Sequence, residues 1–345
     1  MNQVVIRKAA AADIPYIQEF TRNTFEWGDY VSEEVAGWIE ADGDVWVADL
    51  GGRPVGVTHV RYLSGSHVWF EGIRVHHEYR KLGIGKLLTE TSIVGARNRQ
   101  AKIAYAAIDA DNLASQSLAK SVGFKLKDSL VELHLRFHPS DSSERAGVAA
   151  CHCKTQECSN GNAEMQAQSI LVRKAYPHDA GHIYQLGAKH VRFVGSDFIW
   201  RPLTVESLNT THEDETVYVA VRQQQSKKTD NAMLPETMLA AAFAANPWVD
   251  EPKESGKAVK VTFHTGAIYG EDRGVAAIAR FFKQEAYRRG QELRKEGYQD
   301  YSIEIFMHLG KHQESAIDIL ISEGFSLQVG ASGRTSELGI WELTL

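Results

Sequence analysis

The feature that most constrains the fold of this chain is an internal repeat. Residues 6–9 (IRKA), followed by Asp13 and Ile17, recur as residues 172–175 (VRKA), followed by Asp179 and Ile183, at a constant offset of 166. Two later segments keep the same order, since 45–48 (VWVA) is echoed by 217–220 (VYVA) and 121–124 (SVGF) by 322–325 (SEGF). Self-similarity of this kind predicts two copies of one folded unit.

The two copies are separated by a polar stretch, residues 139–168, which holds no aromatic residue and almost no large aliphatic one. Such a segment cannot bury enough apolar area to offset the entropy of ordering it. We therefore predict domains at 1–138 and 169–345 joined by a flexible linker at 139–168. The length of 345 residues agrees with two domains, since single cores rarely exceed roughly 250 residues.

The three cysteines lie together in this linker, as Cys151, Cys153 and Cys158, next to His152. Thiolates and an imidazole are zinc ligands, but the spacing C-H-C-x4-C matches no closed zinc module. We interpret the cysteines as reduced thiols and assign no metal site.

The first half alternates between two hydrophobic periodicities. A period of two predicts strands at about 3–9, 45–50, 54–63, 67–75, 102–108 and 130–137, and helical periodicity predicts helices after Asp13, over 32–40, from Gly85 to about 100, and over 113–122. Asp13 suits the N-cap of the first helix. The predicted order is β-α-α-β-β-β-α-β-α-β.

A glycine-bearing turn joins the strand at 67–75 to the following helix. Its sequence is Arg80-Lys81-Leu82-Gly83-Ile84-Gly85-Lys86. Glycines let the backbone approach a ligand closely, and the first N–H groups of a helix favour a phosphate. The turn matches neither the Rossmann pattern nor the Walker pattern.

The turn resembles the signature of the GNAT superfamily of N-acetyltransferases, Arg/Gln-x-x-Gly-x-Gly/Ala after a strand. The segment from Asn112 to Gly123-Phe124 resembles a second feature of that family. The resemblance implies an α/β (α+β) fold of two tandem GNAT-like domains, each with a mixed, mostly antiparallel twisted sheet flanked by helices. It also implies acetyl-CoA as co-substrate, and it assigns cofactor contacts to Ile73, Arg74, Val75, Arg80, Lys81, Leu82, Gly83, Ile84, Gly85, Lys86 and Asn112.

Glu71 is the predicted catalytic residue. Attack by an alkylamine requires a neutral nitrogen, and some members of the family place a glutamate base nine residues before the first Arg of the motif, where Glu71 stands. A period of two puts Glu71 on one face with Trp69, Ile73 and Val75. The alternative is a salt bridge, to Arg74 or Arg61. We interpret His76 and His77 as surface residues, and Asn112 either as a cofactor contact or as a helix cap.

The sequence departs from the family at two places. Many members have a tyrosine seven residues after the helix Asn, where it protonates the leaving thiolate, but here that position is Ala119, and neither Tyr79 nor Tyr105 can be assigned its role. In the second half the turn reads Glu271-Asp272-Arg273-Gly274, and carboxylates oppose phosphate binding. Gln313 stands for the Asn and Leu320 for the tyrosine, so we predict a degenerate second domain.

Composition limits the partners. A net charge of −6 and a pI near 6.2 are atypical of nucleic-acid-binding proteins. With neither a signal peptide nor a long apolar run, the sequence predicts a cytoplasmic protein without a membrane partner. A homodimer is left open. We predict an N-acetyltransferase acting on a primary amine of a small molecule or amino acid. The alternatives are an acetyltransferase of protein N-termini or lysines, and a non-enzymatic acyl-CoA sensor.

Overall fold

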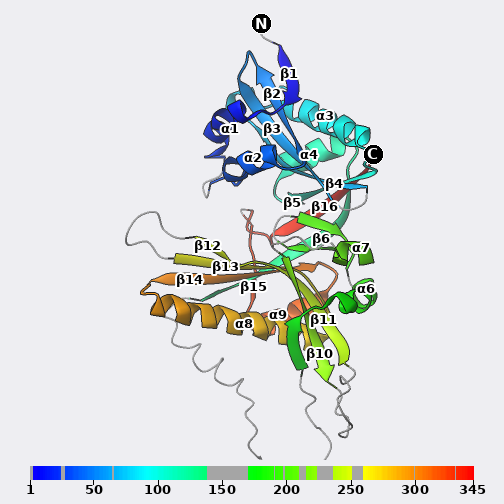
Figure 1. Cartoon of the computed structure of the whole chain (residues 1–345), viewed down its shortest axis with the longest axis vertical. Coiled ribbons are helices and arrows are strands. Elements are labelled where there is room, and N and C mark those ends of the chain that lie inside the picture. Colours follow the sequence, from blue (N-terminus) through cyan, green and yellow to red (C-terminus); the bar gives the residue numbers. More distant parts are fainter. Residues whose placement is uncertain are drawn as a thin grey trace, which may run out of the picture. The chain divides into compact units, whose positions relative to one another are not determined.

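The computed structural model describes residues 3–345 with several gaps (Figure 1). The residues left out are 1–2, 25–27, 64–65, 138–169, 190, 197–198, 210–214, 224–235, 251–258, 299 and 331. The predicted linker and its cysteines lie outside the described residues. Among the described residues, no helix has the length and apolar character needed to cross a membrane.

The chain divides into two compact units. Unit 1 comprises residues 1–129, 199–201 and 337–345, and unit 2 comprises residues 130–198 and 202–336. These units differ from the predicted segments 1–138 and 169–345 by an exchange of strands. The last strand of the chain is part of unit 1, and unit 2 begins inside the strand that was predicted to end the first domain.

Unit 1 contains one mixed sheet in the order β1-β2-β3-β4-β5-β16. Its strands are β1 (Val4–Lys8), β2 (Gly43–Leu50), β3 (Pro54–Tyr62), β4 (His67–Val75), β5 (Ile103–Asp109) and β16 (Glu337–Thr344). Neighbouring strands are antiparallel except for the parallel pair β4 and β5. The predicted mixed, mostly antiparallel sheet is confirmed, and every predicted strand of the first half is present within a few residues.

Helices cover both faces of this sheet, as Figure 1 shows. On one face lie α1 (Ile14–Thr21) and α2 (Val31–Glu40), and on the other lies α3 (Ile84–Asn98), while α4 (Leu113–Ser121) follows β5. The α1 and α2 face packs around Ile17, Val35 and Trp38. The α3 face packs around Leu88 and Ile93. The first half therefore has the predicted α/β architecture.

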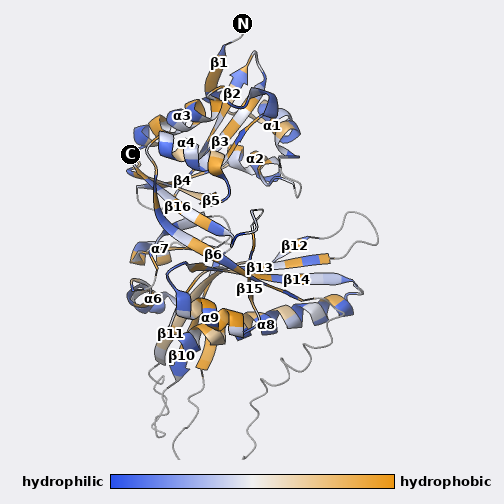
Figure 2. Ribbon diagram, turned by 180° about the vertical axis from the view of Figure 1, so that it is seen from behind, coloured by the Kyte–Doolittle hydropathy of each residue, from blue (hydrophilic) through white to orange (hydrophobic). Residues whose placement is uncertain are grey.

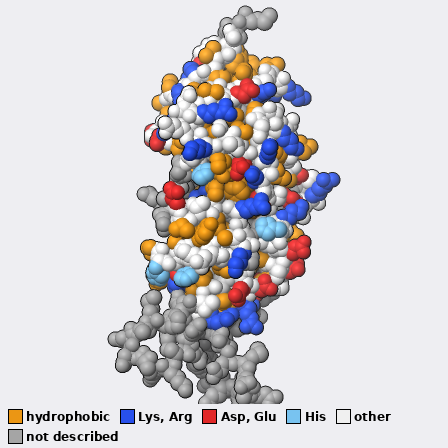
Figure 3. All heavy atoms as spheres, turned by 90° about the vertical axis from the view of Figure 1, so that its right-hand side faces the viewer, with side chains coloured by type: hydrophobic (Ala, Val, Ile, Leu, Met, Phe, Trp, Pro, Cys, Tyr) orange, Lys and Arg blue, Asp and Glu red, His pale blue; other side chains and the backbone are white. Residues whose placement is uncertain are grey.

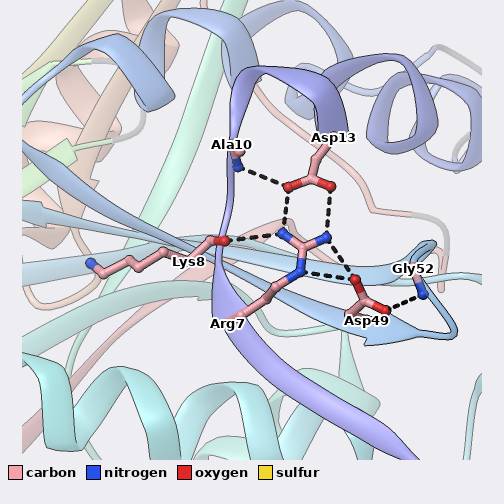
Figure 4. Close-up of polar contacts among 6 residues, drawn as sticks. All are labelled: Arg7, Lys8, Ala10, Asp13, Asp49 and Gly52. Atoms are coloured by element: carbon pink, nitrogen blue, oxygen red, sulfur yellow. Dashed lines mark hydrogen bonds and ion pairs between the residues drawn. The ribbon is translucent and has the colours of Figure 1, made fainter.

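Asp13 occupies the N-cap position of α1, as predicted, but its carboxylate makes no capping hydrogen bond to that helix. Instead it accepts the Ala10 N–H at 2.8 Å, and it accepts two hydrogen bonds from the Arg7 guanidinium at 2.7 and 2.8 Å (Figure 4). Arg7 also donates to Asp49. These contacts tie the entry of α1 to β1 and β2.

The Asp13 contacts predict acid sensitivity. The hydrogen bonds from Arg7 lower the pKa of Asp13 below its usual value. A group whose pKa is lowered by folding contributes stability above its unfolded pKa, about 3.9, and loses it as the pH falls further. Asp13→Asn is expected to cost about 0.5–2 kcal/mol at pH 7, and the difference from wild type should shrink at pH 3. Denaturant unfolding at both pH values measures this, with the exposed Asp42→Asn as the control.

The last strand of the chain completes the sheet of unit 1. β16 pairs antiparallel with β5 from Leu338↔Asp109 to Thr344↔Ile103. Trp341 of β16 is 4% exposed and packs with Val68, Phe70 and Phe124. The core of the first unit therefore includes a side chain from the final ten residues of the chain.

Unit 2 repeats the main order of elements, with the added strands β8, β9 and β12. It contains β7 (Ile170–Lys174), α6 (Ala180–Gly187), β8 (Phe193–Ser196), β9 (Ile199–Pro202, of which 199–201 group with unit 1), α7 (Val205–Asn209), β10 (Glu215–Gln223), β11 (Glu236–Ala245), β12 (Trp248–Asp250), β13 (Val259–Gly270), α8 (Asp272–Lys295), β14 (Tyr301–Gly310), α9 (Glu314–Ser322) and β15 (Ser326–Leu327). Its main sheet runs β7-β10-β11-β13-β14-β6, where β6 spans Lys125–Phe137. In Figure 2, α8 carries both hydrophobic and hydrophilic stretches, as expected for a helix with one face on a sheet.

The repeat seen in the sequence is also a repeat of contacts. Arg173 donates to Asp179 at 2.7 Å, and Asp179 accepts the Tyr176 N–H at 2.7 Å. These are the counterparts of Arg7, Asp13 and Ala10.

Charged side chains of both signs are interspersed on the face drawn in Figure 3. Among the described residues, no group of three or more His, Cys, Asp or Glu side chains is arranged to hold a metal ion.

Candidate active site

A bulge in β4 shapes the centre of the site. The register with β3 pairs His59 with Glu71 and then Val57 with Arg74, so two residues of β4, Gly72 and Ile73, stand opposite one residue of β3. Gly72 has φ +65°, and a Cβ on it would lie 2.5 Å from the ring of Trp38. Only glycine suits this position, because other residues would be strained there and would collide with Trp38.

The bulge overturns the predicted face of Glu71. Before the bulge, Phe70 packs on the α3 side, and after it Ile73 and Val75 pack on that same side. Glu71 lies on the opposite face, next to His59 and Trp38. The expected face shared with Ile73 and Val75 was wrong, because an extra residue in a strand inverts the alternation of its side chains.

The Glu71 carboxylate is buried and paired. Its side chain is 8% exposed, and its Oε1 atom lies 2.8 Å from His59 Nδ1 and 3.2 Å from Arg61 Nε. The salt bridge considered as the alternative role is thus present with Arg61. Arg74, the other candidate partner, instead makes a two-pronged ion pair with Asp29 at 2.6 and 3.0 Å.

The segment before α2 is tied to the bulge. Asp29 has no exposed side-chain area and holds Arg74. Tyr30 hydrogen-bonds to the Gly72 backbone, and burial, with a smaller contribution from the nearby Glu71 charge, raises the pKa of Tyr30 to about 12. The Tyr30 hydroxyl therefore keeps its proton at neutral pH. These contacts hold α2 against the part of β4 that carries Glu71.

β4 and β5 diverge beyond the first part of their pairing. Among the described strands, their parallel register covers only His67↔Ile103 to Trp69↔Tyr105. The His76 N–H donates to Val55 O on the β3 side. Since successive N–H groups of a strand alternate in direction, those of Val75 and Ile73 point to the side where the β5 pairing has ended. Ile73 and Val75, two of the predicted cofactor contacts, thus direct their N–H groups to the side of β4 where it is no longer paired with β5.

The predicted turn forms a concave backbone at the start of α3. Lys81 and Gly83 have left-handed φ values of +65° and +80°, and Gly83 is the N-cap of α3. A helix leaves its first N–H groups without partners inside the helix, which here are those of Gly83, Ile84, Gly85 and Lys86. Donors arranged in this way, at the positive end of a helix dipole, suit a phosphate.

The glycines leave space at the turn. A Cβ on Gly83 would meet no described atom within 4 Å, and a Cβ on Gly85 would make only ordinary contacts, the shortest being 3.5 Å to Leu118. The protein's own packing therefore does not require glycine at position 85. The open backbone fits the diphosphate of coenzyme A, which Arg80 to Lys86 would hold.

This geometry predicts that Gly85→Ala separates binding from folding. Alanine stabilises a helix relative to glycine by up to about 1 kcal/mol, so thermal stability should be equal or higher. A methyl group against the phosphate site should weaken acetyl-CoA binding at least tenfold. Calorimetric titration measures the affinity. The control is Gly37→Ala in α2, an exposed helical glycine whose added Cβ would meet nothing within 4 Å. Equal affinities of both variants would contradict the prediction.

The charged and polar side chains around the turn have local partners. Arg80 Nε donates to Val75 O at 3.2 Å, and Lys86 forms a long ion pair with Glu90. Leu82 is 67% exposed. Asn112 is the N-cap of α4 and accepts the Ser115 N–H at 3.1 Å. The helix-cap role of Asn112 is therefore present, and its contact with a cofactor stays a prediction.

The candidate proton donors for the thiolate differ in their surroundings. Tyr105 is 3% exposed, and burial together with Glu342 of β16 raises its pKa above the usual range. Its hydroxyl is thus engaged inside the sheet. Ala119, at the position where the family has its tyrosine, is 7% exposed in the core of unit 1.

His76 and His77 stack on each other with their ring centroids 4.5 Å apart, and His77 is exposed.

Unit 2 lacks both parts of this site. β13 ends at Gly270 and α8 begins at Asp272, so the loop that carries the turn in unit 1 is missing. A Cβ on Gly270 would lie 2.2 Å from Leu239 O, and one on Gly274 would lie 2.7 Å from Ala240 Cβ. β11 thus fills the space next to these glycines.

The catalytic positions of unit 2 are also altered. β13 contains no Asp or Glu. Gln313, the counterpart of Asn112, is 8% exposed, accepts the Gly310 N–H and donates to Ile268 O. Both ends of its amide are used within the fold.

Comparisons with known proteins agree with this architecture. Residues 14–124 match the model of the acetyltransferase (GNAT) family. The tandem GNAT protein from the clavulanic acid biosynthesis pathway, solved without AcCoA, is 12% identical with a TM-score of 0.55, and the match covers 99% of this chain and 98% of that one. The chain has the fold of a tandem GNAT protein. Residues 14–124, which match the acetyltransferase (GNAT) family model, lie in its N-terminal unit, and acetyl-CoA is the co-substrate of that family.

Other solved structures are similar to this chain over different lengths. A putative acetyltransferase from Thermoplasma acidophilum is 16% identical, with 99% of this chain and 100% of that chain covered and a TM-score of 0.49. A ribosomal-protein-alanine N-acetyltransferase from Brucella melitensis is 28% identical over 37% of this chain and 88% of its own, with a TM-score of 0.33. No curated protein matched the sequence.

Sequence reasoning missed four residues of the site, namely His59, Asp29, Tyr30 and Trp38. Only His59 had a visible signal, since it is the one ionisable residue in the largely apolar run 55–60 (VGVTHV). The other three lie 33 to 42 residues before Glu71 in the sequence, and only the packing of α2 on the bulge brings them to it.

Proposed function

We propose that this tandem GNAT protein transfers acetyl from acetyl-CoA to a primary amine of a small molecule or free amino acid, with Glu71 as general base. The observation that carries the proposal is the placement of one buried carboxylate beside the β4 bulge, on the strand that leads into the turn at Arg80–Lys86. Acetyl-CoA supplies an activated carbonyl. The protein supplies position, charge and a proton acceptor.

The proposed acetyl transfer conserves atoms, protons and charge. An alkylammonium ion gives one proton to Glu71, directly or through one water, because only the neutral nitrogen is nucleophilic. The nitrogen then bonds to the carbonyl carbon, and the carbon–sulfur bond breaks. The nitrogen loses its second proton as the thiolate gains one. The products are an N-acetyl amine, a free thiol and one proton released from Glu71.

Backbone donors support the charged intermediate. The N–H groups of Ile73 and Val75 point away from β3, and such preorganised donors stabilise an oxyanion. Since Ala119 replaces the usual tyrosine, we propose that water protonates the thiolate, whose pKa near 8.5 makes it a fair leaving group.

We propose that unit 2 binds no coenzyme A and that its role is structural. The missing turn, the packing of Gly270 and Gly274 against β11, and the internal bonds of Gln313 all support this. Calorimetric titration of the full chain with acetyl-CoA is then expected to give one site per chain. A stoichiometry of two would contradict this part of the proposal.

A second candidate function, a non-enzymatic acyl-CoA sensor, is favoured by one observation, the absence of the tyrosine at position 119. A thiol-release assay with acetyl-CoA separates the two functions. The panel of acceptors comprises polyamines, free amino acids and peptides with free N-termini or lysines. Turnover on a small amine supports the proposal, and turnover on the peptides alone indicates a protein acceptor. Tight acetyl-CoA binding without turnover indicates the sensor.

A further inference from the structure

His59 is the closest neighbour of the Glu71 carboxylate. It lies on β3, directly across from Glu71 in the register, and its side chain is 2% exposed. Its Nδ1 atom is 2.8 Å from Glu71 Oε1. A carboxylate only accepts hydrogen bonds, so the proton of this bond belongs to Nδ1 and the imidazole is the donor.

The imidazole of His59 is closely packed. One face stacks on Trp38, with ring centroids 4.6 Å apart and planes 16° apart. Nε2 lies against Gly43, where a Cβ would be only 2.4 Å away. No described residue gives this buried Nε2 a hydrogen-bond partner. A proton on Nε2 would therefore be buried without an acceptor, which favours the tautomer with its proton on Nδ1.

Arg61 acts on the same oxygen from the more exposed side. Its Nε is 3.2 Å from Glu71 Oε1, and its side chain is 34% exposed. Among the described residues both donors to Glu71 thus use Oε1. Two directed hydrogen bonds to one oxygen fix the rotation of the carboxylate, and they leave Oε2 for another donor.

We propose that His59 is the positioning residue of the general base, which it orients so that Oε2 receives the proton of the acceptor amine. This inference rests on the proposed function of Glu71. His59 touches no substrate in this role and passes on no proton, because its Nδ1 already carries one and its Nε2 faces Gly43. It keeps the carboxylate oriented.

Two substitutions separate this role from mere packing. His59→Phe keeps a ring stacked on Trp38 but removes the donor. His59→Asn removes the ring but places an amide N–H close to the position of Nδ1. A residue that only fills space would lower the melting temperature in both variants and leave the pH profile of kcat unchanged.

The variants are compared by kcat, KM, pH profile, acetyl-CoA affinity and melting temperature. The assay uses acetyl-CoA and the amine with the highest turnover in the panel above. His59→Phe is expected to lower kcat at least tenfold at pH 7 and to move the acid limb of the pH profile upward by roughly one unit, because a hydrogen bond to a charged group is lost. Acetyl-CoA affinity should stay within twofold. His59→Asn should restore most of kcat and the wild-type limb.

A third variant displaces the His59 imidazole without replacing the residue. Gly43→Ala puts a methyl group where Nε2 lies and must displace the imidazole. It is expected to lower kcat in the same direction as His59→Phe, whereas Gly37→Ala, with open space around it, should not. This variant keeps the test valid if His59→Phe fails to fold.

A readout without any acceptor completes the test. In the full chain labelled with ¹⁵N-histidine, the two-bond spectrum of the ring should show His59 with its proton on Nδ1 at pH 7, and Nε2–H would overturn the inference. If Glu71→Gln is inactive while His59→Phe and Gly43→Ala keep the wild-type kcat and pH profile, the positioning role of His59 is wrong. The proposal that Glu71 is the general base would still stand. If Glu71→Gln is fully active, the proposed function itself fails.

Discussion

Replacement of Glu71 by Gln is expected to lower kcat at pH 7 by a factor of about 10²–10⁴, the usual contribution of a general base. Gln has nearly the same size, and its amide oxygen can still accept from His59 and Arg61, but it cannot take a proton from an ammonium ion. Acetyl-CoA affinity should stay within about twofold, because the turn after Arg80 is unchanged. Steady-state kinetics and calorimetric titration measure the two quantities.

The pH dependence of this variant is equally informative. An alkylamine with a pKa near 10 is already neutral above that pH, so the deficit of Glu71→Gln should narrow as the pH rises toward 10. The matched control is Glu78→Gln, which removes the same charge from an exposed glutamate close to the turn. Turnover of Glu71→Gln within threefold of wild type at pH 7 would reject Glu71 as the base.

Replacement of Trp341 by Ala is expected to destabilise unit 1 by about 3–5 kcal/mol, the usual cost of truncating a buried Trp. Trp341 belongs to the last ten residues of the chain but lies in the core of the first unit with Val68 and Phe124. Hydrogen exchange measures the effect locally. Amides of β5, which pairs with β16, should lose protection by several orders of magnitude.

The control for this prediction is a tryptophan that lies in a strand but is exposed. Trp248 of β12 is 56% exposed, so Trp248→Ala should change stability by no more than about 0.5 kcal/mol. Unaltered protection of β5 in Trp341→Ala would show that β16 is not part of the unit 1 core. A chain that ends before residue 337 should show the same loss as Trp341→Ala, or a larger one.

Much of the fold was accessible from the sequence because it depends on local patterns. Apolar alternation and turn residues placed the strands and helices of the first half within a few residues. The turn after β4 was equally readable, since glycines next to an amphipathic helix need no distant partner to be recognised. Asp13 stands at the predicted N-cap of α1, but its carboxylate binds Arg7 and the Ala10 N–H in place of the helix.

For the second unit, the structure offers a different reason against phosphate binding from the one that the sequence suggested. The carboxylates of Glu271 and Asp272 suggested that phosphate binding is lost. In the structure Glu271 is largely exposed, and the stronger obstacle is steric, since β11 packs on Gly270 and Gly274 where a ligand would need room. A glycine in a sequence does not reveal whether it admits a ligand or a neighbouring strand.

The sequence by itself determined the repeat, the order of elements in the first half, and the strand, turn and helix of the predicted cofactor site, because each depends on neighbouring residues. Only the tertiary structure decided the face of Glu71, its bond to His59, and the placement of β16 in unit 1. The physical reason is that a bulge, a cross-strand pair and a strand exchange are choices between alternative pairings of distant segments. Local propensity is nearly equal for those alternatives, and packing of the whole chain selects among them.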